Sequence, residues 1–86
     1  MNDKVIIDLI VPEVAESFNI FLPINKKMGT IVKLLCKAIN ELTNGDFPIT
    51  ANCKLYNSET LQVYEPNVLL FNTDIRNGTK LVLLTK

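Results

Sequence analysis

This chain has 86 residues, of which 48% are hydrophobic, and its nine basic residues balance nine acidic ones. The length suits one domain with a small core, and the hydrophobic content is too high for a disordered chain. The zero net charge disfavours nucleic acid and anionic membranes as partners, and no apolar stretch is long enough to span a bilayer. Because residues 1–10 also lack a secretory-signal pattern, we expect a single cytoplasmic domain, residues 1–86.

Two alternating apolar runs come first in the chain. Residues 5–11 carry an apolar side chain at every second position, and Asp8 marks the solvent side of this predicted strand. A similar run at residues 18–22 follows a short interruption, and Pro23 ends it because proline has no N–H to donate. The short connection predicts an antiparallel hairpin. The residues expected to face the core are Val5, Ile7, Leu9, Val11, Phe18, Ile20 and Leu22.

One amphipathic helix is predicted over residues 30–42, where apolar residues recur every three or four positions. Thr30 is a candidate N-cap, although a start nearer Lys27 fits as well, and Asn44-Gly45 supplies a stop. A one-sided apolar stripe belongs across one face of a sheet. The stripe consists of Ile31, Leu34, Leu35, Ala38, Ile39 and Leu42.

The rest of the chain predicts short strands separated by turns. Residues 53–56 form a short strand, residues 60–64 are a candidate edge strand, and residues 80–84 form a final apolar strand. Continuous apolar character suits a central strand, so we expect the first and last strands to pair in parallel. The order ββαββ predicts an α+β fold with a mixed sheet and one helix packed across one face.

The set of reactive side chains and motifs in the sequence disfavours an enzymatic function. The sequence contains no histidine, no glycine-rich phosphate loop and no nucleophile motif, and its carboxylates are scattered. Cys36 and Cys53 are too few and too far apart for a metal site or an iron–sulfur cluster, so we expect no cofactor. We expect both to be reduced and partly buried, with a disulfide between them as the less favoured alternative in a reducing compartment.

Two stretches carry a resemblance to known proteins. Residues 75–84, with Ile75, the Asn77-Gly78 turn and the closing apolar strand, resemble the end of the ubiquitin-like β-grasp, and the likeness extends over nearly the whole chain. Residues 18–23 followed by residues 31–35 are similar to the YukD/EsaB family, ubiquitin-fold proteins encoded with bacterial type VII (WXG100) secretion systems.

The resemblance implies a non-enzymatic, non-conjugated cytosolic accessory component that binds a membrane or cytosolic protein of the secretion apparatus. The alternative is a β-grasp carrier or modifier that acts through its C-terminus. Such proteins end in a flexible diglycine tail, whereas this chain ends in Leu84-Thr85-Lys86. The mass of the protein from cells would show whether Lys86 is ever covalently joined to another molecule.

The resemblance also implies a docking surface, because the outer face of the third and last strands has this role in ubiquitin-like folds. There, Tyr56, Val82 and Leu84 would form an apolar spot rimmed by Lys54 and Lys80. Exposed aromatic and branched side chains in a cluster indicate a protein partner. The alternative is that these residues have no binding role and are apolar side chains scattered over the surface, as on any protein. The same sheet face also carries Ile6, Ile10 and Phe21.

Overall fold

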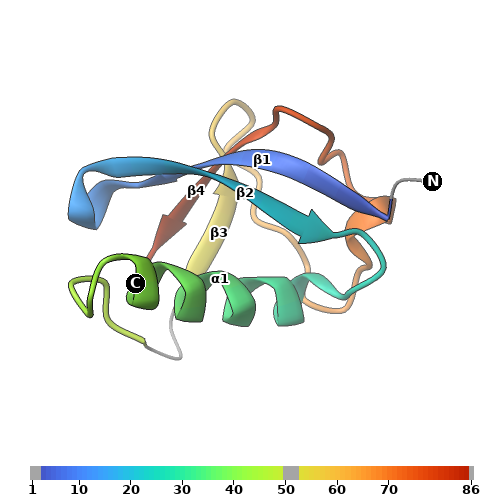
Figure 1. The fold of residues 1–86 in the computed structure, drawn as a ribbon. Helices are drawn as coiled ribbons and strands as arrows, with labels where there is room; N and C mark the ends of the chain where they lie inside the picture. Colours follow the sequence, from blue (N-terminus) through green and yellow to red (C-terminus); the bar gives the residue numbers. More distant parts are fainter. Residues whose placement is uncertain (1–2, 50–52, 86) are drawn as a thin grey trace.

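The computed structural model describes residues 3–49 and 53–85, which form one mixed sheet and one long helix (Figure 1). The order of the elements confirms the predicted ββαββ arrangement. In chain order they are β1 (Lys4–Val11), the 3₁₀ turn η1 (Pro12–Val14), β2 (Glu16–Pro23), α1 (Met28–Leu42), β3 (Lys54–Asn57), the 3₁₀ turn η2 (Leu70–Asn72) and β4 (Lys80–Leu84).

The predicted hairpin is confirmed, since β1 and β2 pair antiparallel from Lys4 opposite Pro23 to Val11 opposite Glu16. The chain reverses between them through η1 and through Ala15, whose φ of 55° lies in the left-handed region. The apolar residues of both strands alternate toward the core as expected from their period of two.

The strand order is β2-β1-β4-β3, so β4 has a neighbour on each side. It pairs in parallel with β1, with Leu9 beside Leu81, and antiparallel with β3, with Leu55 beside Leu83. This confirms the expected parallel pairing of the first and last strands. The turn before β4 is fixed to β1, because the Gly78 N–H donates to the Ile6 carbonyl over 2.8 Å.

Helix α1 crosses one face of the sheet (Figure 1). It begins at Met28, directly after Lys27, so the earlier of the two predicted starts is correct. The predicted stop is also confirmed: Asn44 has a φ of 54°, and the Gly45 N–H donates to the Asn40 carbonyl over 2.8 Å. The buried residues of the helix are Met28, Ile31, Leu35, Cys36 and Ile39.

Three members of the predicted stripe do not belong to the buried core, because Ala38 is only half-buried and the two leucines at its edges are exposed. Leu34 is 47% exposed and Leu42 is 60% exposed. The buried face of α1 includes Cys36 on one flank, and this rotates Leu34 to the opposite rim of the stripe. Leu42 is the last residue of the helix, where the stripe no longer has a buried neighbour beyond it.

The core also contains residues from irregular segments. Leu70 in η2 and Ile75 ahead of β4 are both buried, as the resemblance to the ubiquitin-like closing segment implied. Phe47 is fully buried as well, although the sequence did not predict it. Its position just after the glycine stop is the available signal, because an apolar residue there often folds back onto the helix end.

The candidate edge strand at residues 60–64 is wrong. Across this segment the structure has a single isolated bridge, between Tyr56 and Val63. The Asn57 side chain draws the chain into a turn, because its Oδ1 accepts from the N–H groups of Glu59 (2.8 Å) and Thr60 (3.2 Å). Leu61 then takes a φ of 62°, which is incompatible with a regular strand.

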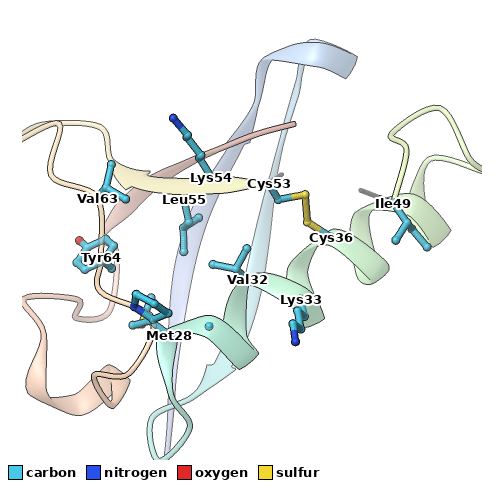
Figure 2. A pocket seen from close by; sticks show the side chains of 12 residues that line it. Met28, Val32, Lys33, Cys36, Ile49, Cys53, Lys54, Leu55, Val63 and Tyr64 are labelled. Atoms are coloured by element: carbon cyan, nitrogen blue, oxygen red, sulfur yellow. A yellow bond between two sulfur atoms is a disulfide. The ribbon is translucent and has the colours of Figure 1, made fainter. Parts of the chain in front are cut away.

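The expectation of two reduced cysteines is also wrong, because a disulfide joins Cys36 to Cys53 (Figure 2). The bond links α1 to the residue that precedes β3, across 17 positions of sequence. Spacing in the sequence did not reveal this pairing. It arises because the helix crosses the sheet beside the start of the edge strand β3 (Figure 1).

Candidate interaction surface

All five predicted surface residues lie on the sheet face that points away from α1, here called the outer face. Lys54 is paired with Leu84 and Tyr56 with Val82 across β3 and β4. The alternate residues of these strands, including Leu55, Leu81 and Leu83, are buried in the core under the helix. The structure therefore brings Lys54, Tyr56, Lys80, Val82 and Leu84 together on one face, as expected.

Val82 differs from the expectation, since only 7% of its surface is exposed. Strand β4 is central, so Val82 is flanked by Ile10 of β1 and by Tyr56 of β3. These neighbours cover it from both sides. Val82 therefore lies beneath the surface and packs against its neighbours. The accessible apolar area comes from half-buried Tyr56, Leu84 and Ile10.

Ile10 extends the predicted spot into a row that crosses three strands, Ile10, Val82 and Tyr56. The neighbouring row is polar, because Asp8 stands beside both Asn19 and Lys80. That polar row separates the spot from Ile6 and the 66% exposed Phe21. The apolar residues of the outer face are thus divided into two groups.

A hydrogen-bonded cluster lies beyond the edge strand. The Tyr64 hydroxyl donates to Asp74 Oδ1 over 2.8 Å and accepts from Asn57 Nδ2 over 3.3 Å. Burial raises the pKa of Tyr64 to about 12, and the negative charge of Asp74 acts in the same direction. The hydrogen bond from Asn57 opposes the shift, because it stabilises the phenolate.

The Tyr64→Phe variant is expected to lose a tyrosinate transition near pH 12. In the folded chain the phenol stays neutral up to about pH 12, whereas the ordinary value is 10.0. Its contribution to stability is therefore present below pH 10 and is lost as the pH rises from 10 through about 12. Ultraviolet titration of the wild type and the variant, with Tyr56→Phe as the matched control, measures the tyrosinate transition. If the transition persists in Tyr64→Phe, the assignment is incorrect.

Among residues 3–49 and 53–85, no group of histidine, cysteine, aspartate or glutamate side chains is arranged to hold a metal ion. No helix in that part of the chain is long and apolar enough to cross a membrane. The alternative role placed on Lys86 falls outside the described residues.

Comparison with known proteins gives a fold but no family model. The sequence matches no family model, and no curated protein matches it. Among solved structures, a chain of the MycP5-free ESX-5 inner membrane complex has a TM-score of 0.80 at 16% identity, covering 99% of this chain and 21% of that one. The EccD5 ubiquitin-like domain from Mycobacterium xenopi has a TM-score of 0.77 at 13% identity, covering 99% of this chain and 97% of that one.

The same architecture also occurs in an unrelated setting. A chain of the toluene 4-monooxygenase HD complex with 4-bromobenzoate has a TM-score of 0.76 at 5% identity, covering 96% of this chain and 99% of that one. At these identities the similarity establishes the fold alone. This chain has the ubiquitin-like fold, an α+β sheet with one helix, and its structural neighbours include a chain of the ESX-5 inner membrane complex and the EccD5 ubiquitin-like domain.

Proposed function

We propose that this chain, as one domain over residues 1–86, is a non-enzymatic, non-conjugated protein-interaction module. Its proposed role is that of a cytosolic accessory component of a bacterial type VII (WXG100/ESX-like) secretion system, as in the YukD/EsaB family. The observation that carries the proposal is the similarity to the ESX-5 chain and to the EccD5 ubiquitin-like domain, each over 99% of this chain.

The proposed contact site is the apolar row on the outer face, with Tyr56 and Leu84 as anchors and Val82 beneath them. Lys54 and Lys80 are exposed at its rim, where they favour a partner with acidic groups. The contrast with the solvent side of α1 supports this choice. Lys33, Lys37 and Glu41 are exposed there, and burying charged groups has a desolvation cost.

Combining Tyr56→Ala with Leu84→Ser is expected to weaken binding to the cytosolic domains of the secretion apparatus by at least about tenfold, or 1.4 kcal/mol. The aromatic anchor and the branched side chain supply most of the accessible apolar area of the row. Surface plasmon resonance with each purified cytosolic domain in turn measures the change.

A matched control is the pair Phe71→Ala and Leu34→Ser, because these residues are 49% and 47% exposed and lie outside the sheet. The control should retain wild-type binding. Melting temperatures of both double variants test for loss of folding, since Leu84 is half-buried. Full binding by a well-folded Tyr56→Ala/Leu84→Ser variant would contradict the proposed site.

In cells, loss of the chain should reduce export of WXG100 substrates, and normal export would contradict the proposed role.

A further inference from the structure

The Cys36–Cys53 disulfide lies at the edge of the sheet, next to the outer face. Cys53 directly precedes β3, the four-residue edge strand that supplies Lys54 and Tyr56 to that face. Cys36 is one of the buried residues of α1, so the bond ties the start of β3 to the helix (Figure 2). The position of Lys54 on the outer face is therefore coupled to a covalent link made directly before it.

The two ends of β3 are held in different ways. Beyond its C-terminal end, the Ser58 N–H donates to the Lys80 carbonyl over 3.0 Å. At its start, Lys54 lies opposite Leu84, the last residue of β4, and next to the disulfide. Loss of the disulfide should therefore loosen the Lys54 end of the strand and leave the Asn57 end in place.

The middle of β3 does not depend on the disulfide. Leu55 is 2% exposed, packs in the core and pairs with Leu83 of β4. These contacts remain when the sulfur–sulfur bond is broken, so the sheet should keep its strand order. Opening the bond thus changes the order of one end of β3 without unfolding the chain.

One of the two cysteines is within reach of a reductant. Cys36 is 3% exposed, whereas Cys53 is half-buried. Both line an open groove of about 380 Å³ between α1 and β3, and the disulfide joins its two walls (Figure 2). Thiol–disulfide exchange requires a thiolate to reach one of the sulfur atoms, and Cys53 is the more accessible of the two residues.

An accessible disulfide has a particular meaning in a cytosolic protein, because dithiol proteins keep thiols reduced there and the disulfides that form are mostly transient or redox-sensing. We propose that the Cys36–Cys53 disulfide is a reversible redox link, whose reduction by a cytosolic dithiol protein loosens the start of β3 and weakens contact at the outer face. This inference rests on the cytosolic role and the contact site proposed above, and it adds a means of regulating that site.

The exchange has two steps. A thiolate of the dithiol protein attacks Cys53 Sγ, the bond to Cys36 breaks, and Cys36 leaves as a thiolate that takes up a proton. The second thiol of the reductant loses its proton, attacks the reductant's own sulfur in the mixed disulfide, and releases Cys53 as a thiolate, which is then protonated. Two electrons pass to the chain, and the reductant is left as a disulfide. The same steps in reverse, with an oxidised dithiol protein, restore the link.

The first test treats the oxidised full chain with thioredoxin, a dithiol protein, together with thioredoxin reductase and NADPH. Acid quenching, followed by alkylation in denaturant, adds mass to every thiol, so mass spectrometry measures the reduced fraction. We expect complete reduction of the folded chain. Thioredoxin that lacks its second cysteine should be trapped as a mixed disulfide with Cys53. A chain that resists reduction until it is unfolded, or trapping at Cys36, would overturn the proposal.

Nuclear magnetic resonance of the isotope-labelled chain shows what reduction changes. The heteronuclear Overhauser effect of the backbone amide should fall at Lys54 on reduction and stay constant at Leu9 and Leu81 in the paired core strands. Cys36→Ala/Cys53→Ala is the matched control, which should resemble the reduced wild type and ignore the reductant. Should this variant not fold, the reduced wild type still gives the measurement. Equal order at Lys54 in the oxidised and reduced wild type would contradict the inference.

Surface plasmon resonance with the cytosolic domains of the secretion apparatus measures the effect on the outer face. The reduced wild type is expected to bind at least about threefold more weakly than the oxidised form, because Lys54 and Tyr56 are less preorganised. Equal binding by the two forms would overturn the proposed regulation and leave the contact site intact. Absence of binding by both forms would refute the contact site, whereas reduction with loss of order at Lys54 would still support the redox link.

In cells, acid-quenched samples should contain more of the disulfide form after addition of diamide, which oxidises cytosolic thiols, and less after recovery. A chain that stays fully disulfide-bonded throughout has a permanent cross-link, and one that stays fully reduced never forms the bond. Either result would overturn the proposal.

Discussion

Replacing Phe47 by alanine is expected to lower the free energy of unfolding by about 3–5 kcal/mol. The side chain is fully buried in the core, and the neighbouring backbone is fixed to the end of α1. The Phe47 N–H donates to Thr43 Oγ1 over 3.1 Å, and its carbonyl accepts from Asn40 Nδ2 over 2.9 Å. These bonds prevent the segment from collapsing into the cavity, so most of the cost remains. Denaturant unfolding, followed by circular dichroism, gives the value.

Ile49→Ala is the control for this variant, because Ile49 follows closely in the chain but is 63% exposed. Its effect should stay within about 0.5 kcal/mol. A loss below about 1 kcal/mol for Phe47→Ala would show that the segment after α1 is not part of the cooperative core.

Leu35→Ala is expected to lower the free energy of unfolding by about 2–5 kcal/mol, whereas Leu34→Ala should lower it by less than about 1 kcal/mol. Leu35 is 1% exposed and Leu34 is 47% exposed, although they are adjacent in the sequence. The two substitutions remove the same atoms from the same helix, so helix propensity cancels in the comparison. Equal losses from both variants would show that the helix sits on the sheet in a different rotation.

The outer face was partly predictable from the sequence. Alternation along the strands placed Tyr56, Val82 and Leu84 on one side, and their pairing in the structure agrees. Alternation specifies a face but not exposure. Val82 is covered because Ile10 and Tyr56 flank it on both sides, and this follows from the central position of β4.

A groove between α1 and β3 was not predictable in the same way. Its walls come from α1, β3 and the segments that follow each of them, and the disulfide between Cys36 and Cys53 forms one end. The sequence contains Cys36 and Cys53, but no pattern in it indicates that the two side chains lie close together. Only the crossing of the helix over the sheet brings these segments to one place.

By itself, the sequence determined the four strands of the sheet, the helix and their order, because a period of two or of three to four residues is a local property that burial imposes. It failed at residues 60–64, where the turn that the Asn57 side chain stabilises replaces the expected strand. It also determined the helix stop at Asn44-Gly45, where backbone conformation depends on the residue itself. The tertiary structure decided the rotation of α1 that buries Leu35 rather than Leu34, and the burial of Phe47 and Val82. Those outcomes depend on contacts between segments distant in the chain, whose packing no local pattern records.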